Sequence, residues 1–363
     1  LSAQGSAAAP RPAGWDAVDA DPDPSLPSRR SVWTTTTPCR RGGGFGETMS
    51  DTTQHPAPVP TELRWLEDHS GLRRAQAECA TPSSEDELRA LFRWAASERR
   101  TITLRGGGQC LHGQSVGDDV VVELSAFDRV SVDLEAGGVE GGAGARWADV
   151  RAALPPGWVV PNLVKPGVAS VGGTLVADPA SRFSSAFGRE ADGVRRAQLM
   201  MADGSIVECD REGPHAELFH ALPGSVGMLG ALLRVEHALV DVRHLLASDG
   251  SLRVKTVVRK HPGARSLLAD LALELRAPCS RRRPRGAYGL LVRGCGALLF
   301  HSTYTSEPRA RRMPNHRRRD WLRVAIEHGF HVPAVNRALW AAIFTHYYRD
   351  GDCFVDDAED FAR

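Results

Sequence analysis

Glycine is concentrated in short segments between about residues 105 and 230, and these segments constrain the fold more than any other feature of the sequence. The first is Arg105-Gly106-Gly107-Gly108, which directly follows residues 102–104, a short apolar stretch that reads as a strand. Glycine can adopt a positive φ and lets the backbone approach a ligand closely. Successive N–H groups in such a turn form a concavity that binds anions. An ordinary glycine turn remains the alternative for this segment taken alone.

The spacing of these glycines excludes two common nucleotide-binding loops. The Rossmann fingerprint requires a third glycine at position 111, which is Leu111. A phosphate loop that ends in Gly-Lys-Ser or Gly-Lys-Thr is also absent. If the segment binds an anion, it does so in another structural context.

Further glycine motifs follow in a fixed order. Residues 170–175 read as a short apolar strand with a double glycine, a pattern typical of close backbone approach to a ligand, and residues 184–188 and 193–194 follow. Residues 201–205 contain Asp-Gly, which predicts a hairpin turn. Residues 217–230 read as a helix that runs into glycines spaced by three. Each motif alone fits an ordinary turn, but their order is harder to explain in that way.

The composition is that of a globular protein of about two domains. Of the 363 residues, 42% are hydrophobic and 25% are charged, and the net charge of +1 indicates neither a nucleic-acid nor a membrane partner. The seven cysteines form no CxxC pair, which favours reduced thiols and argues against a zinc or other metal site. No apolar run approaches the roughly 18 residues of a membrane span, and the first residues lack a secretory pattern. These features predict a cytoplasmic location and leave the oligomeric state open.

The sequence divides into three regions. Residues 1–60 are polar and lack apolar periodicity, so they are expected to be disordered, and Met49 is a candidate natural start. Residues 61–240 form the expected first domain, and residues 241–363 the expected second, α/β domain. Helices are predicted at 85–96, where Ser84 and Glu87 form a capping-box pattern, and at 147–154, 216–222, 266–275 and 336–348. Strands are predicted at 102–104, 120–124, 130–134, 232–239, 252–258 and 297–304.

Taken together, the motifs resemble the FAD-binding domain of the vanillyl-alcohol oxidase and p-cresol methylhydroxylase (PCMH) superfamily over about residues 60 to 240. The family order is an Arg-Gly-x-Gly loop, a Thr-Val-Gly-Gly strand, a Ser-x-x-Gly turn, an Ala-Asp-Gly hairpin and Glu-Leu-Phe leading to Gly-x-x-Gly. The resemblance implies an α+β fold with a two-subdomain PCMH-type FAD-binding domain, followed by an incomplete α/β cap or substrate domain. It also implies FAD as cofactor, and hydride transfer between the flavin and a small organic substrate.

The resemblance assigns candidate cofactor-binding residues. The loop at 105–110 would cradle the pyrophosphate, residues 170–174 would line the pyrophosphate and isoalloxazine side, and Ala177 would lie beside the flavin. Ser185, Gly188 and Val194 would border the cofactor, and Leu232 would pack near the adenine. The predicted set is Arg105, Gly106, Gly107, Gly108, Gln109, Cys110, Ser170, Val171, Gly172, Gly173, Thr174, Ala177, Ser185, Gly188, Val194 and Leu232.

The sequence departs from the family pattern at several positions. Family members that attach FAD covalently usually carry His directly after the glycines, where this chain has Gln109, and His112 reads as a polar loop residue. Dissociable FAD is therefore expected. The glycine-rich stretch of the family is replaced by residues 178–181, so a different local geometry beside the flavin is expected. No catalytic base can be named, because the position where an oxidase places His is Ala180.

Two branches of the family and two rival functions stay open. Residues 160–161, 184–185 and 222–225 are similar to sterol side-chain reductases, whereas Asn336 and residues 347–349 are similar to decaprenylphosphoryl ribose oxidases. The chain ends near where a further cap segment would begin, so a flavin-binding remnant without turnover is the alternative. A nucleic-acid or anion-binding module would use the arginine clusters near 281–283, 309–312 and 317–319, but these lack interleaved aromatic residues.

Overall fold

The fold is that of a computed structural model, which describes residues 55–161, 167–276, 284–292, 294–311 and 348–358, together with 338, 341, 342 and 344. Most of the predicted disordered segment lies outside these residues. So do Asn336, most of the predicted 336–348 helix, and the arginine clusters at 281–283 and 317–319.

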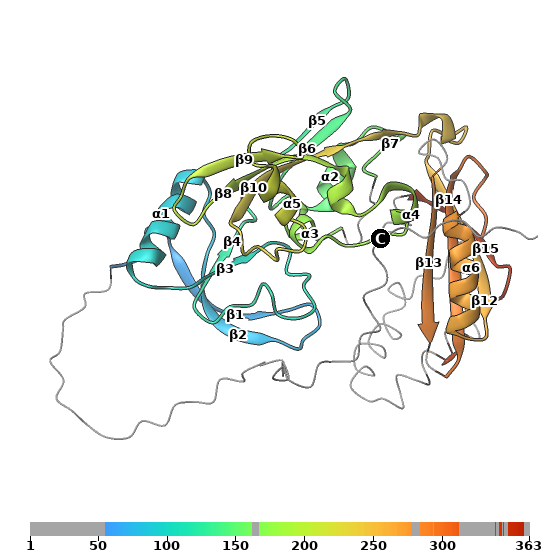
Figure 1. Cartoon of the computed structure of the whole chain (residues 1–363), viewed down its shortest axis with the longest axis horizontal. Helices are drawn as coiled ribbons and strands as arrows, with labels where there is room; N and C mark the ends of the chain where they lie inside the picture. Colours follow the sequence, from blue (N-terminus) through green and yellow to red (C-terminus); the bar gives the residue numbers. More distant parts are fainter. Residues whose placement is uncertain are drawn as a thin grey trace, which may run out of the picture. The chain divides into compact units, whose positions relative to one another are not determined.

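The first sheet has four strands in the order β1-β2-β4-β3 (Figure 1). Its strands are β1 (Thr61–Glu67), β2 (Arg74–Ala80), β3 (Ile102–Arg105) and β4 (Val120–Glu123). β1 and β2 pair antiparallel, whereas β4 runs parallel to both β2 and β3. Helix α1 (Glu85–Ser97) begins where the capping pattern predicts it, because the Ser84 hydroxyl accepts a hydrogen bond from the Glu87 N–H at 3.2 Å. Its buried face packs in the same core as Val120 and Val122.

The second sheet has five antiparallel strands in the order β5-β6-β10-β8-β9. These are β5 (Val130–Asp133), β6 (Gly138–Gly142), β8 (Val194–Met200), β9 (Ile206–Asp210) and β10 (Ala231–Ala238). The predicted Asp203-Gly204 turn joins β8 to β9, with Gly204 at φ +84°. One hydrophobic cluster includes residues of both sheets, among them Val122, Leu199 and Val235, so the two sheets share a core. A mixed α+β fold is thereby confirmed.

Short helices connect the strands of this region. They are α2 (Trp147–Ala153), α3 (Val171–Ala177), α4 (Ser184–Phe187), η1 (Glu190–Gly193) and α5 (Ala216–Ala221). The strand predicted at residues 170–175 is wrong, because this segment begins α3, capped by Ser170. Val171 and Leu175 stand four residues apart and are both buried, as on one helix face that contacts β6 and β10. Two glycines weaken local helix propensity, so tertiary packing decides this element.

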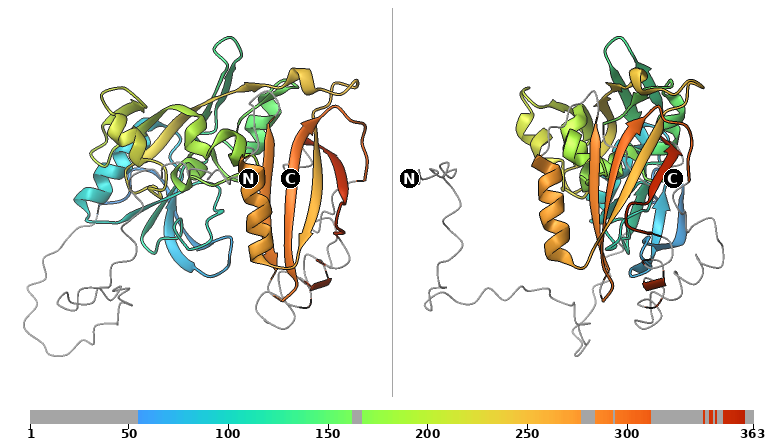
Figure 2. Two further views of the ribbon diagram at one scale, coloured as in Figure 1. Left: turned by 45° about the vertical axis from the view of Figure 1, so that its right-hand side comes forward. Right: turned by 90° about the vertical axis from the view of Figure 1, so that its right-hand side faces the viewer.

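The remaining described chain forms a sheet with a helix against it. The order is β13-β14-β12-β15, and the elements are β12 (Arg253–His261), α6 (Ala264–Arg276), β13 (Arg285–Val292), β14 (Gly296–Thr305) and β15 (Cys353–Asp357). Figure 2 shows α6 lying along this sheet, where it contacts β13 and β14. All strand pairs are antiparallel, so the α/β unit predicted for this region is wrong. The physical reason is the short β13–β14 connection, since parallel neighbours require a long crossover.

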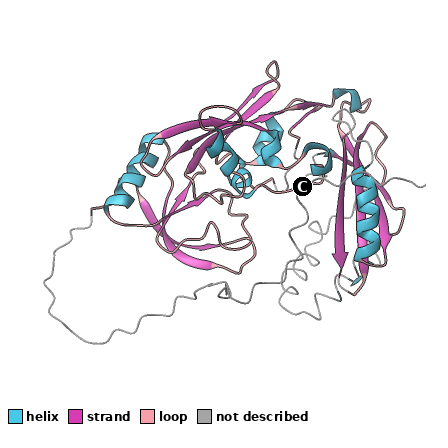
Figure 3. Cartoon of the chain, viewed as in Figure 1, coloured by secondary structure: helices cyan, strands magenta, loops and turns pink. Residues whose placement is uncertain are grey.

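A short pair of strands, β7 (Trp158–Val159) and β11 (Val240–Asp241), and the 3-10 helix η2 (Arg243–Leu245) complete the described elements (Figure 3). Within the described ranges, no helix combines the length and apolar character needed to cross a membrane. The described residues also contain no group of three or more His, Cys, Asp or Glu side chains arranged to hold a metal ion. The cysteines that the structure describes, at positions 79, 110, 209, 295 and 353, are free thiols.

Candidate cofactor site

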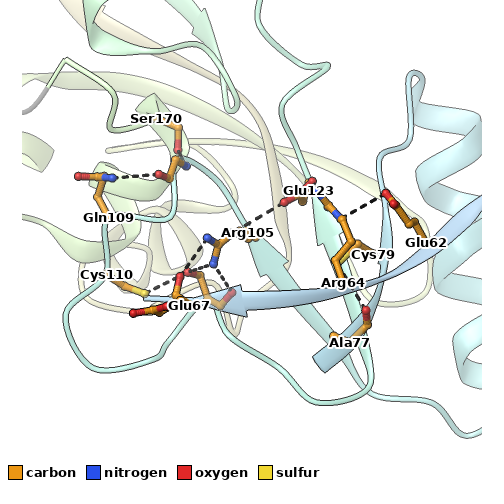
Figure 4. Close-up of polar contacts among 12 residues, drawn as sticks. Glu62, Arg64, Glu67, Ala77, Cys79, Arg105, Gln109, Cys110, Glu123 and Ser170 are labelled. Atoms are coloured by element: carbon orange, nitrogen blue, oxygen red, sulfur yellow. Dashed lines mark hydrogen bonds and ion pairs between the residues drawn. The ribbon is translucent and has the colours of Figure 1, made fainter. Parts of the chain in front are cut away.

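Three glycine segments that are distant in sequence meet beside α3. The Gly107 N–H donates to the Ser170 hydroxyl at 3.2 Å, which joins the loop after β3 to the start of α3 (Figure 4). The Val226 N–H donates to the Val176 carbonyl at 3.1 Å. A Cβ placed on Gly227 would lie 3.9 Å from Leu104 Cδ1 of β3. We call residues 105–110, 168–173 and 224–227 the glycine cradle.

Two glycines of the cradle are required by close approach of the chain to itself. A Cβ on Gly106 would collide with the Ser170 hydroxyl, and a Cβ on Gly107 would collide with the Val168 carbonyl oxygen. Neither contact leaves space for a side chain. The first two glycines of the motif thus set the spacing between the loop and α3.

The loop after β3 presents backbone donors that the chain itself does not use. Among the described residues, the N–H groups of Gly106, Gly108, Gln109 and Cys110 have no hydrogen-bond acceptor. Gly108 has φ +66°, a left-handed conformation that occurs in the backbone turns whose successive N–H groups bind anions. Such an arrangement fits the oxygens of an anionic group such as a diphosphate.

The Arg105 side chain braces this loop from within the protein. Its Nη1 donates to the Ser115 carbonyl at 3.1 Å, and its Nη2 donates to the Glu67 carbonyl at 3.2 Å. Its Nε lies 3.7 Å from the Glu123 carboxylate, which also pairs with Arg64 (Figure 4). Only 14% of the side chain is exposed. The guanidinium therefore holds the loop in place, and the open donors of the cradle are backbone N–H groups.

The side chains that follow the glycines fold back onto the same loop. Gln109 Nε2 donates to the Gly107 carbonyl at 3.3 Å, and Cys110 Sγ lies 3.0 Å from the Ser115 hydroxyl. His112 is exposed, and its N–H donates to Gln114 Oε1. These contacts agree with the expectation that His112 is a polar loop residue.

The predicted residues of α3 fall into an exposed set and a buried set. Gly173 and Ala177 are exposed, whereas Val171, Gly172 and Thr174 are buried. The Gly172 N–H donates to the Ala143 carbonyl of the core. The exposed edge of α3 is therefore the part that is open to a ligand.

The structure places the other predicted residues outside the cradle contacts. Gly188 ends α4 with φ +80°, and its N–H donates to the Ser184 carbonyl. Val194 and Leu232 are buried in the core shared by the two sheets. Their assignment to the cofactor stays a prediction.

Ser185 belongs to a different pocket. Its hydroxyl donates to the Arg285 carbonyl of β13 at 2.9 Å, and it lines this pocket with Glu274 and His301. His301 Nδ1 lies 3.3 Å from Glu274 Oε2, and within the described residues His301 Nε2 is buried without a hydrogen-bond partner. Burial lowers the pKa of His301, so the neutral ring is favoured and Nε2 becomes a hydrogen-bond acceptor when Nδ1 carries the proton. The sequence contained no motif that pointed to this pair.

The departure at residues 178–181 has a structural explanation. Asp178 ends α3 in the left-handed region with φ 45°, a conformation usually taken by glycine. Its carboxylate pairs with Arg189 and accepts the Ala191 N–H at 3.2 Å. These contacts hold an aspartate at a position where the resemblance predicts glycine.

The comparisons with known proteins decide what kind of domain holds this cradle. Residues 77–210 match the family model described as an FAD binding domain. The chain contains an FAD-binding domain. FAD is its cofactor, and the resemblance to flavoproteins is confirmed. The cradle lies mostly within the matched residues, and only its third segment, 224–227, follows them.

The sequence relatives of the chain include proteins that are oxidoreductases by name. The chain is similar to an uncharacterized oxidoreductase of Rhodococcoides fascians, 29% identical over 154 residues, which are 42% of this chain and 35% of that protein. It is also similar to decaprenylphosphoryl-beta-D-ribose oxidase of Mycolicibacterium smegmatis, 30% identical over 179 residues, 48% of this chain and 38% of that protein. L-Gulonolactone oxidase of Mus musculus is 28% identical over 179 residues, 49% of this chain and 40% of that protein. The chain thus spans well under half of the length of each of these relatives.

Solved structures share the fold at low identity. A BBE-like 1 protein of Physcomitrella patens superposes with a TM-score of 0.56 and 15% identity, over 83% of this chain and 60% of that one. The glucooligosaccharide oxidase of Acremonium strictum gives a TM-score of 0.56 and 16% identity, over 79% and 55%. At this identity the likeness concerns the fold alone.

Proposed function

We propose that the chain is an FAD-dependent oxidoreductase that transfers hydride between a small organic substrate and non-covalently bound flavin. The observation that carries this proposal is the glycine cradle. Four N–H groups of the 106–110 loop have no hydrogen-bond acceptor among the described residues, and this loop lies against α3 of an FAD-binding domain. Backbone donors of this kind bind phosphate oxygens.

The surroundings of the cradle suit the apolar parts of a dinucleotide. Four apolar residues on its segments or next to them are at least 41% exposed: Leu111, Val168, Val226 and Met228. Exposed apolar side chains that gather at one place mark a binding surface. In the proposal, backbone N–H groups hold the diphosphate of FAD, and these apolar side chains cover parts of its ring systems and exclude water.

The chain's part in the reaction is to bind and orient, whereas FAD, when bound, supplies the hydride chemistry. We propose that the flavin dissociates, since Gln109 replaces the usual His and its side chain bonds within its own loop. The proposed domain limits are 1–60 for the N-terminal segment, 61–240 for the FAD-binding domain and 241–363 for a substrate domain. The pocket of Ser185, Glu274 and His301 is lined by residues of α4, α6, β13 and β14, and in the proposal the substrate domain contributes the last three elements.

The rival proposal is a flavin-binding remnant without turnover, whose substrate domain lacks catalytic residues. The two proposals differ in what reduced flavin does. Flavin in the holoprotein is reduced anaerobically with dithionite and then mixed with oxygen or a quinone. Reoxidation by either acceptor that is faster than that of free reduced FAD under the same conditions supports the oxidoreductase, and reoxidation that is no faster supports the remnant.

The first test is flavin binding by the full-length chain. The absorption spectrum is recorded before and after acid precipitation, and the melting temperature is measured with and without added FAD. Flavin released into the supernatant and a rise in melting temperature are expected. A protein that carries no flavin and gains no stability from FAD would overturn the proposal.

A glycine substitution tests the site itself. Gly107→Ala is expected to weaken FAD binding by about 100-fold or more, because its Cβ would collide with the Val168 carbonyl and displace the loop from α3. Gly263→Ala is the matched control, since it also removes a glycine without positive φ but its Cβ meets nothing within 4 Å. Calorimetry gives both dissociation constants. Equal affinity in the two variants would exclude the cradle as the diphosphate site.

A further inference from the structure

A buried carboxyl group beneath α3 takes no part in the cradle contacts. Glu190, at the start of η1, is 1% exposed. Its Oε1 accepts a hydrogen bond from the Thr174 hydroxyl at 2.8 Å and lies 3.4 Å from His237 Nε2 of β10. Trp147 Nε1 of α2 donates to the same Thr174 hydroxyl at 2.9 Å, and the Trp147 ring meets His237 edge-on at 5.1 Å. This buried network therefore joins α2, α3, η1 and β10.

Burial of the Glu190 carboxyl group in this network lowers the stability of the fold. Burial raises the pKa of Glu190, against the opposing effect of His237 and Thr174, and nearby Asp178 raises it as well. Among the described residues, Glu190 Oε2 is buried without a hydrogen-bond partner. A buried polar oxygen left in this way costs stability. An apolar residue would avoid this cost, so the carboxyl group calls for a role other than stability.

The network reaches α3 through Thr174, one helical turn after Ser170 of the cradle. Thr174 follows Ser170 by four residues in α3, and the Ser170 hydroxyl accepts the N–H groups of Gly107 and Gly173. A helix as short as α3 has little stability of its own, so its position depends on side-chain anchors. Thr174 is the buried anchor, and Asp178, which pairs with Arg189, holds the far end.

We propose that Glu190 is a positioning residue, which fixes α3 through Thr174 and so sets the affinity of the glycine cradle for the diphosphate of FAD. This inference rests on the proposed function. Neither residue touches the cofactor in this account, and Thr174, predicted to line the cofactor, acts from the buried side of α3.

The proposal has a consequence for pH. The titratable groups facing Glu190 are His237 on β10 and Asp178 at the end of α3, which is paired with Arg189, whereas α2 contributes the uncharged Trp147. A diphosphate in the cradle would add negative charge near Glu190 and favour the neutral carboxyl group further. FAD binding is therefore expected to take up a proton at Glu190, and the affinity for FAD is expected to fall as the pH rises through the raised pKa of Glu190.

The test measures the FAD dissociation constant and the stability of the apoprotein in the full-length chain, from mildly acidic to mildly alkaline pH. Thr174→Val is expected to weaken FAD binding by about tenfold, since it removes the hydroxyl that joins Glu190 to α3. Thr174→Ser keeps this hydroxyl and is expected to restore the affinity. Glu190→Gln mimics the neutral carboxyl group, so it is expected to bind FAD with an affinity that no longer depends on pH in this range.

Thr256→Val is the matched control. Thr256 is 1% exposed, and its hydroxyl lies 3.0 Å from that of Ser302 in the sheet of β12 to β15. Its loss is expected to lower stability and leave FAD affinity unchanged. If Thr174→Val lowers stability as Thr256→Val does but binds FAD like the wild type, Glu190 does not position the cradle. If Glu190→Gln does not fold, the comparison of Thr174→Val with Thr174→Ser decides the question.

Failure of the proposal and failure of the proposed function are separable. A wild-type chain that binds no FAD overturns the function and this inference together. Suppose that the wild type binds FAD, that the variants at position 174 keep the FAD affinity of the Thr256→Val control, and that this affinity does not change with pH. This result overturns only the inference.

Discussion

Val226 combines a β-branched side chain with a left-handed backbone conformation. It has φ 55°, between Gly224 at φ 80° and Gly227 at φ 83°. A β-branched residue in the left-handed region is a rare outlier, and the side chain is 41% exposed, so burial does not compensate for the strain. The Val226 N–H donates to Val176 of α3, which places this strain at the cradle. Strained backbone of this kind clusters at functional sites.

Relieving this strain is expected to stabilise the apoprotein. Val226→Gly removes about 1–3 kcal/mol of strain and adds about 0.5–1 kcal/mol of chain entropy to the unfolded state, so the free energy of unfolding is expected to rise by about 1 kcal/mol. Urea denaturation measures it. Gly224→Ala is the reverse control, since its Cβ meets nothing within 4 Å and only the backbone conformation opposes it. A lower free energy of unfolding in Val226→Gly would contradict this prediction, because it would show that contacts of the valine side chain stabilise the fold by more than the backbone strain costs.

The sequence predicted some residues of the site for reasons that the structure revises. Gly106 and Gly107 were expected to approach a ligand, and the structure shows that they approach Ser170 and Val168. Arg105 was expected in the phosphate loop, and its guanidinium instead braces that loop from inside. The direction of a long side chain depends on partners far away in sequence, which no local motif records.

Helix α1 is the element whose start the sequence predicted most directly. Ser84 caps it as expected, but the Glu87 carboxylate accepts from the N–H and hydroxyl of Ser83, and not from the Ser84 N–H of a standard capping box. The local pattern thus located the helix start correctly, but the partner of the Glu87 carboxylate is Ser83, one residue before the predicted Ser84.

Ser84→Ala is expected to lower the free energy of unfolding by about 1 kcal/mol, because the Glu87 N–H loses its acceptor. Thermal and urea denaturation measure the loss. Ser97→Ala serves as the control, since the Ser97 hydroxyl only donates to the Trp94 carbonyl, which is already the acceptor of the Glu98 N–H. An equal effect of both substitutions would contradict a specific role for the cap.

Helix α3 shows where local pattern is insufficient. The run Ser-Val-Gly-Gly-Thr-Leu is too short to distinguish a strand from a helix by its periodicity. Ser170 satisfies the Gly173 N–H, and Val171 and Leu175 enter the shared core. The decision is made by β6 and β10, which α3 contacts and which lie outside the motif.

At the scale of the whole described chain, a small core joins the FAD-binding region to the sheet of β12 to β15. Phe183 and Phe187 pack in one cluster with Val254 and Tyr304, and the rings of Phe183 and Tyr304 stack at 4.8 Å between centroids. The Ser185 hydroxyl bonds to β13 next to this cluster. The two regions are therefore expected to unfold together.

Phe183→Ala is expected to lower the stability of the whole chain by about 3–5 kcal/mol, because Phe183 is completely buried and its removal leaves a cavity between the two regions. Leu268→Ala, at a side chain that is 60% exposed on α6, is expected to change stability by less than about 0.5 kcal/mol. Urea unfolding followed by fluorescence and by far-UV circular dichroism gives both values. Two separate transitions in the wild type would show that the regions fold independently.

The sequence by itself determined the order of the glycine motifs, the cap of α1 and some of the strands, among them β4 and β10, because these follow from backbone chemistry over a few neighbouring residues. That order was sufficient to indicate an FAD-binding domain. The tertiary structure alone decided which N–H groups stay open, where the Arg105 guanidinium points, and that Glu190, Thr174 and His237 share one buried network. Each of these depends on groups that only folding brings together, and their distances and burial are not encoded in any single segment of the chain.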